Sequence, residues 1–153
     1  DRVRKGIAET RAELPRRGLP VTVIHGVDDG LIPMAFTSAP YVAHARAAGR
    51  DVRFWQVRNA QHFDAFIDNG LLAGYDTNLV PLHVYFNRSM DIMYAHLKNG
   101  TALPDSQVIR TTPRGGTAGS APALTAGNIP PIAATPAAGD VISYTGGTVS
   151  IPQ

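Results

Sequence analysis

Val21-Thr-Val-Ile-His-Gly-Val-Asp-Asp-Gly-Leu-Ile-Pro33 is a short apolar, β-branched run that stops at a Gly, two carboxylates, a second Gly and a Pro. A run of this length bounded by turn residues predicts a buried strand of a parallel sheet. Its polar residues follow the carboxyl end of the strand, where open α/β sheets place their active sites. We therefore expect an α/β fold with a functional site just beyond this strand.

A second unit of the same kind follows along the chain. Val52 to Val57 predicts another strand, and Asn59-Ala-Gln-His-Phe-Asp-Ala-Phe66 is the loop after it. Between the two strands, Ser38 to Ala48 has a helical pattern that Gly49 ends. A right-handed crossover between neighbouring parallel strands would bring both loops to the same sheet edge. Because such strands lie about 5 Å apart, an Asp of the first loop can reach a His of the second.

The remaining sequence predicts three further elements and three regions. An amphipathic helix that packs on the sheet is expected from Val3 to Leu14, and a long helix from Leu79 to Leu97. Thr111 to Gly139 is dominated by Ala, Pro, Thr and Gly, so it should be extended or disordered, and a terminal β-hairpin should follow it. The expected division is an α/β region over 1–110, the extended segment over 111–140 and the hairpin over 141–153.

Composition excludes several classes of protein. With 44% hydrophobic residues, the 153-residue chain can form a core. Its formal charge of +2 comes from Lys and Arg spread along the chain without interleaved aromatic residues, so no nucleic-acid partner is expected. No cysteine is present and no apolar run approaches membrane-spanning length. We expect no cofactor, metal or membrane partner, and the compartment stays open. Because the sequence begins at Asp1 rather than Met, we expect a piece of a longer protein.

Asp29 and His62 are the candidate catalytic residues. In Ser-His-Asp hydrolysis the His takes the nucleophile's proton, while a buried carboxylate fixes its tautomer. Here the acid precedes the base, as in α/β-hydrolases. Asp28 could hold the same role, either carboxylate could merely hold a turn, and His62 could cap a helix or fill a polar niche. His25 is expected to shape the first turn, while the other histidines, His44, His83 and His96, lie on predicted helices.

The nucleophile is missing from the sequence. No Gly-x-Ser-x-Gly turn is present, and the absence of cysteine excludes a thiol. Ser120 lies in the Ala/Pro-rich segment without a strand before it, and Ser38, Ser89 and Ser106 lie in predicted helices or turns. The chain therefore predicts the acid–base half of a triad.

Several longer stretches are more specific than this spacing. His25-Gly-Val-Asp-Asp-Gly-Leu-Ile-Pro33 is similar to the pattern around the triad acid of α/β-hydrolases. Together with Asn59–Phe66, the resemblance rests on Gly74-Tyr-Asp-Thr77, Val80-Pro-Leu-His-Val-Tyr-Phe-Asn-Arg88 and Val108-Ile-Arg-Thr-Thr-Pro-Arg-Gly-Gly116. From about Leu19 to its end, the chain resembles the carboxyl-terminal part of bacterial D-(−)-3-hydroxybutyrate oligomer hydrolases.

This resemblance implies a serine esterase of the α/β-hydrolase type that cleaves short 3-hydroxybutyrate oligomers, a small-molecule ester substrate. It assigns Asp29 as acid and His62 as base, and it implies a serine upstream of Asp1 on the same polypeptide. Alone, this chain should then be inactive. Two alternatives remain at this stage: a carboxylic ester hydrolase of the tannase or feruloyl esterase type, and a non-catalytic interaction module in which Asp29 and His62 only stabilise turns.

Overall fold

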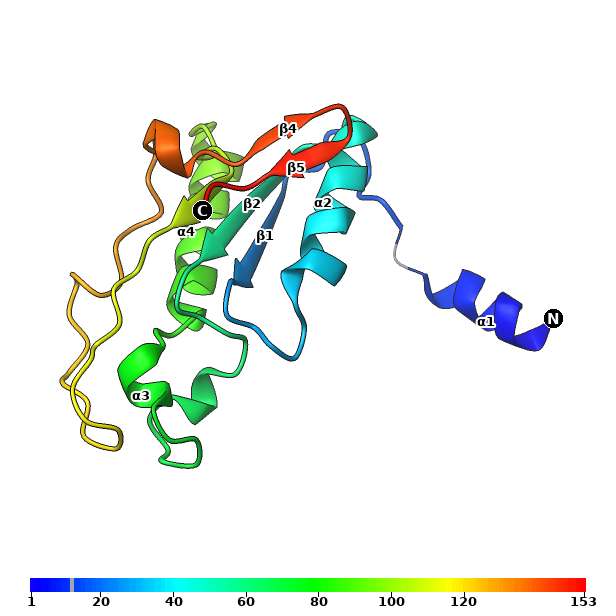
Figure 1. Ribbon diagram of the computed structural model, residues 1–153. Helices are drawn as coiled ribbons and strands as arrows, with labels where there is room; N and C mark the ends of the chain where they lie inside the picture. Colours follow the sequence, from blue (N-terminus) through cyan, green and yellow to red (C-terminus); the bar gives the residue numbers. More distant parts are fainter. Residues whose placement is uncertain (12) are drawn as a thin grey trace.

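A three-stranded parallel sheet forms the centre of the protein (Figure 1). The structure, a computed structural model, describes residues 1–11 and 13–153. The strands lie in the order β1 (Val21–Gly26), β2 (Val52–Val57) and β3 (Gln107–Ile109). The parallel α/β arrangement predicted for the first two strands is confirmed, with Val21 opposite Val52 and Gly26 opposite Val57. The sequence did not predict β3, which pairs with the end of β2.

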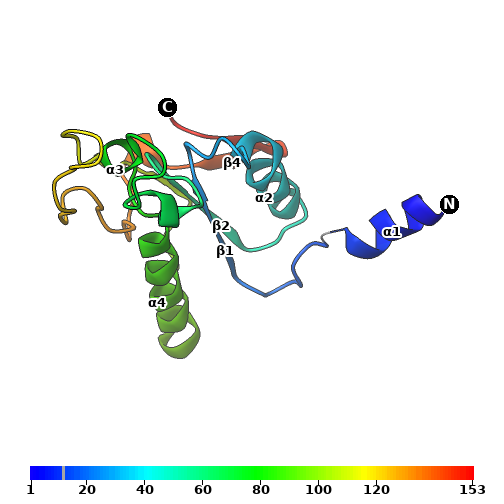
Figure 2. The same ribbon diagram turned by 90° about the horizontal axis from the view of Figure 1, so that it is seen from below.

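Helices cover both faces of the sheet (Figure 2). Side chains of β2 alternate between the two faces: Val52 and Phe54 pack against α2 (Ser38–Ala47), whereas Trp55 and Val57 pack with Tyr85 of α4 (His83–Asn99). All of these strand residues are fully buried. The two apolar clusters hold β1 and β2 in the middle layer of the fold. No helix within residues 1–11 and 13–153 combines the length and apolar character needed to cross a membrane.

Helix α4 begins later than the sequence pattern predicts. Its first residue is His83 rather than Leu79, which has extended backbone angles. The carboxylate of Asp64, in the short 3-10 turn Asp64–Phe66, accepts the backbone N–H groups of Leu82 and His83 at 2.8 and 2.7 Å. This carboxylate satisfies two of the unpaired donors at the helix start and favours its dipole. At the other end, Gly100 takes a left-handed conformation and stops the helix, as predicted.

The amino-terminal helix does not pack on the sheet, contrary to our expectation. Helix α1 (Arg2–Thr10) has no buried residue and stands apart from the other elements (Figures 1 and 2). Its two large apolar residues, Val3 and Ile7, are 75% and 61% exposed. Two side chains among many charged ones offer too little apolar area to hold a helix on a core. The predicted range reached Leu14, which packs near α2 outside the helix, and included Ala12, which lies outside the described residues.

The segment that follows β3 is attached to the loop before α4, and the chain then ends in a hairpin. The predicted loop over 69–77 ends in the one-turn helix α3 (Tyr75–Asn78). Buried Asp76 accepts the N–H of Gly119 at 2.8 Å, and Arg114 donates to the Asp76 carbonyl at 2.7 Å, so the segment after β3 is fastened to α3. A 3-10 turn (Ala138–Asp140) precedes β4 (Ser143–Thr145) and β5 (Thr148–Ser150), whose antiparallel pairing confirms the predicted hairpin.

A candidate acid–base site at the sheet edge

The loops that follow β1 and β2 lie directly against each other. The N–H of Val27 donates to the Val57 carbonyl at 2.8 Å, and the N–H of Asp28 donates to the Ala60 carbonyl at 3.0 Å. Gly26 permits this approach, because a Cβ at that position would lie 2.2 Å from the Ala60 oxygen. The contact is made by backbone atoms, so the two loops have a fixed relative position.

This contact brings Asp29 and His62 together. Asp29 Oδ2 lies 2.6 Å from His62 Nδ1, within the hydrogen-bond reach that the sequence predicts. Because an ionised carboxylate only accepts, Nδ1–H is the donor, and in a neutral imidazole Nε2 then keeps a free lone pair. The Asp29 side chain is 4% exposed, whereas that of His62 is 25% exposed and stacks near the Phe63 ring. The pair therefore combines a buried acid with an accessible base, although its catalytic role remains a prediction.

The second oxygen of Asp29 is held by its own loop. Asp29 Oδ1 accepts the N–H groups of Leu31 and Ile32 at 3.1 and 2.9 Å. Burial raises the pKa of Asp29, but the hydrogen bonds from Ile32 and His62 favour the ionised form more strongly, and the net pKa lies below its ordinary value. The neighbouring Asp28 is exposed. Of the two carboxylates that the sequence left open, Asp29 is the one hydrogen-bonded to His62.

The other histidines have separate roles. His25 Nε2 makes a 2.9 Å hydrogen bond with the Ile32 carbonyl and lies 4.0 Å from Asp29 Oδ2, so it shapes the acid loop as expected. His96 Nδ1 is bonded to the Thr101 carbonyl at the end of α4, and His44 is exposed on α2. His83 lines a small cavity beside His62. Only His62 is hydrogen-bonded to a carboxylate among the histidines of the described residues.

Two adjoining cavities flank the imidazole of His62. One has a volume of about 280 Å³ and includes Ile24, Ile32 and Leu82 in its lining, together with Asp29. The other, of about 190 Å³, is lined by Ile24, Leu82, His83 and Phe86 around His62. Sequence patterns did not reveal this apolar surrounding, because Leu82 and Phe86 appeared only as members of a helical stripe. An apolar pocket beside a base suits a small, largely aliphatic substrate.

None of the four serines considered from the sequence is placed to attack a substrate with His62. Ser38 lines the larger of these cavities, but its Oγ is inaccessible to solvent. Ser89 is buried, and the Ser106 hydroxyl accepts the N–H of Phe54 at 2.9 Å. Ser120 lies at a separate cavity beside Asp76. Across the described part of the chain, no serine hydroxyl is hydrogen-bonded to His62.

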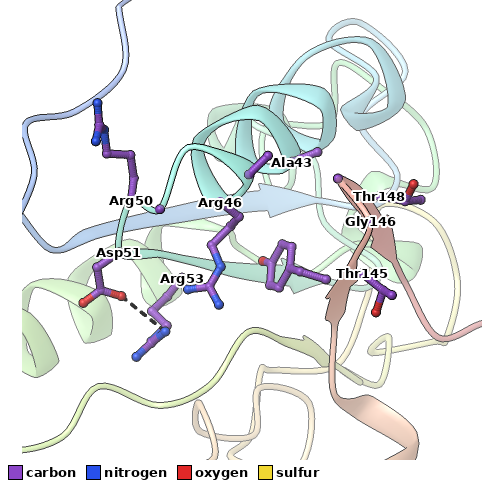
Figure 3. A pocket seen from close by; sticks show the side chains of 12 residues that line it. Ala43, Arg46, Arg50, Asp51, Arg53, Thr145, Gly146 and Thr148 are labelled. Carbon is purple, nitrogen blue, oxygen red and sulfur yellow. Dashed lines mark ion pairs between the residues drawn. The ribbon is translucent and has the colours of Figure 1, made fainter.

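A larger cavity, of about 640 Å³, lies at the amino-terminal end of β2 (Figure 3). It is formed by the end of α2, the start of β2 and the turn between β4 and β5. Arg46 lies 4.7 Å from the centre of the Tyr144 ring, and Arg53 forms a 3.3 Å ion pair with Asp51. Its lining contains arginines but no histidine. The only acid in this lining, Asp51, is paired with Arg53, so the cavity lacks the carboxylate–histidine pair that Ser-His-Asp chemistry requires.

A family model and several known proteins match this chain. The family model of 3HB-oligomer hydrolases matches residues 1–153. A D-(-)-3-hydroxybutyrate oligomer hydrolase of Paracidovorax citrulli is 52% identical over 99% of this chain and 22% of its own length. Proteins of the same name from an Azoarcus species and from Cupriavidus necator are 48% and 50% identical, over 99% and 90% of this chain and 22% and 19% of their own lengths. No solved structure matches the chain.

These relatives are several times longer than this chain. The chain spans about a fifth of the length of each relative. The similarity nevertheless extends over nearly the whole of this chain, including both loops of the acid–base pair. The chain belongs to the 3HB-oligomer hydrolase family.

Proposed function

We propose that this chain supplies the acid and the base of a Ser-His-Asp esterase that hydrolyses 3-hydroxybutyrate oligomers to monomers. The observation that carries this proposal is the 2.6 Å contact between Asp29 and His62 at the carboxyl edge of a parallel sheet. Membership of the 3HB-oligomer hydrolase family supports the substrate class, a small ester. No nucleic-acid or membrane partner and no cofactor are part of the proposal.

In the proposed reaction, Asp29 holds His62 in one tautomer. The Nδ1–H bond to the carboxylate leaves Nε2 to take the proton of a serine as the serine oxygen attacks the ester carbonyl. When the alcohol leaves, the imidazolium returns that proton to it, and a water activated in the same way releases the second hydroxybutyrate. Throughout the cycle the ionised Asp29 stabilises the positive charge that forms on His62.

The serine would come from another part of a longer polypeptide. This arrangement is supported by the fact that the chain spans only about a fifth of the length of its relatives. It is also supported by the absence, in the described residues, of a serine hydrogen-bonded to His62. Within residues 1–11 and 13–153, β1 pairs with β2 alone, so one edge of β1 beside the site is free. We infer that further strands of an α/β-hydrolase-like sheet lie along this edge, with 1–110 as part of the catalytic domain, 111–140 as an extended segment and 141–153 as a hairpin.

Fluorophosphonate labelling tests the proposal. The label should mark a polypeptide that contains this sequence together with the serine, and His62→Ala should abolish labelling and reduce kcat by about 10⁴-fold. His44→Ala is the matched control, because His44 is exposed on α2 and should be replaceable without loss. Label on the isolated 153-residue chain would overturn the placement of the serine. Activity of His62→Ala within tenfold of the unmodified protein would favour a non-catalytic role for this half-site.

A further inference from the structure

The side chain of Gln61 closes a ring around the backbone of His62. Its Nε2 donates to the Phe63 carbonyl at 2.6 Å, and its Oε1 accepts the Phe63 N–H at 2.7 Å. The Gln61 amide thus spans His62 and forms hydrogen bonds with both the backbone N–H and the carbonyl of Phe63. Gln61 is 7% exposed, so these two hydrogen bonds are shielded from water.

The loop is fixed immediately before and after this ring. On one side, the Ala60 carbonyl accepts the N–H of Asp28 from the acid loop. On the other side, the Asp64 carboxylate is bonded to the first N–H groups of α4. His62 is the residue between these attachments whose side chain turns to Asp29. The Gln61 amide is therefore placed to limit rotation of the peptide groups that carry the imidazole.

We propose that Gln61 is a positioning residue that holds the His62 imidazole in line with Asp29 and with the attacking serine. The inference rests on the proposed function. Without the amide, the Phe63 N–H loses the acceptor that Gln61 provides, while the Phe63 carbonyl keeps its 3.1 Å bond from the Phe66 N–H. The loop can then relax toward other hydrogen-bond partners. A displacement of a catalytic group by about 1 Å can cost about 10²-fold in rate.

Gln107 provides a matched control for a merely structural effect. Its Nε2 donates to the Ala133 carbonyl at 2.9 Å and its Oε1 accepts the Ala133 N–H at 3.0 Å, the same amide-to-backbone pairing. It is 2% exposed and lies on β3, outside the cavities around His62. Replacing either Gln by Met keeps the side-chain length and removes the hydrogen bonds of the amide, two at Gln61 and three at Gln107, whose Nε2 also donates to the Asp105 carbonyl at 3.0 Å. Gln107→Met should therefore perturb folding at least as much as Gln61→Met, but the two substitutions should differ in their effect on catalysis.

The experiment measures kcat, KM and fluorophosphonate labelling rate in the polypeptide that contains this chain and the serine. Gln61→Met should lower kcat and the labelling rate by about 30- to 100-fold, with KM within about twofold. Gln107→Met should leave kcat within about threefold, even if its thermal midpoint falls as far as that of Gln61→Met. Gln61→Glu keeps an acceptor for the Phe63 N–H, so it should recover part of the lost rate.

Each outcome separates this inference from the proposed function. If His62→Ala is inactive but Gln61→Met retains kcat within threefold, Gln61 has no positioning role and the triad proposal stands. Equal losses of kcat in the Gln61→Met and Gln107→Met variants would also overturn the inference. If Gln61→Met does not fold, a Gln61→Ala variant, which also lacks both hydrogen bonds, would contradict the inference if it folds and has unchanged kcat and labelling rate. If His62→Ala stays active, the proposed function itself fails.

Discussion

Replacing Asp29 by Asn offers the sharpest test of the acid–base assignment, because the structure determines how the new amide must lie. Leu31 and Ile32 direct two N–H groups at Asp29 Oδ1. An Asn at this position must present its carbonyl oxygen to them, since its NH₂ group would oppose donor to donor. The NH₂ group then faces His62 Nδ1.

This orientation forces His62 into the wrong tautomer. Nδ1 must accept a hydrogen bond from the amide, which places the ring proton on Nε2, where the serine proton should go. The same change in a Ser-His-Asp protease lowers kcat by about 10⁴-fold. We therefore expect Asn at position 29 to lower kcat by about 10⁴-fold, which corresponds to about 5 kcal/mol of transition-state stabilisation. Both backbone hydrogen bonds survive, so the variant should still fold.

The assay is hydrolysis of 3-hydroxybutyrate oligomers near neutral pH by the polypeptide that contains this chain and the serine. Asp28→Asn is the control, because Asp28 is exposed and adjacent in sequence. We expect that variant to keep its kcat within about twofold. An Asp29→Asn enzyme within tenfold of the unmodified protein, or a larger loss for Asp28→Asn, would refute the tautomer argument.

Three further predictions follow from the same loops. Gly26→Ala should reduce the free energy of unfolding by about 1–3 kcal/mol, measured by chemical denaturation, because its Cβ would collide with the Ala60 backbone; an unchanged midpoint would contradict that contact. Asp64→Ala should cost about 1–2 kcal/mol by removing the acceptor of two N–H groups at the start of α4, whereas Asp64→Asn should recover part of it. The pKa of Asp29 is lowered on folding, so its ionised form stabilises the protein above about pH 4. This contribution should disappear as the pH falls through the folded-state pKa. Chemical denaturation at a series of pH values should therefore show a smaller loss of the free energy of unfolding at acidic pH for Asp29→Asn than for the unmodified protein.

The first two strands and the contact between Asp29 and His62 could be predicted from the sequence for a physical reason. Val21–Ile24 is a short, mainly apolar run and Val52–Val57 is rich in β-branched and aromatic residues; turn residues follow both, which predicts the two strands and the end of the sheet at which the next residues meet. The short strand β3 has no such signal. Gln107-Val-Ile109 is only three residues long, and its place depends on pairing with Trp55 to Val57.

Other features depend on contacts that a linear pattern does not contain. The sequence left Asp28 and Asp29 open, and the choice follows from which carboxylate meets the N–H groups of Leu31 and Ile32. The pattern over Val3 to Leu14 was amphipathic, but the helix has no partner surface among the described residues. The Gln61 ring around His62 needs backbone angles that composition does not reveal.

The backbone contact between the loops after β1 and β2 determines which mutations those loops should tolerate. Its hydrogen bonds use the N–H groups of Val27 and Asp28, which every residue except proline can supply. In a saturation scan, positions 27 and 28 should therefore accept many side chains and reject proline, while Gly26 should accept almost none. The spacing of the two loops would then tolerate sequence changes at positions 27 and 28, because Gly26 and two peptide groups set it.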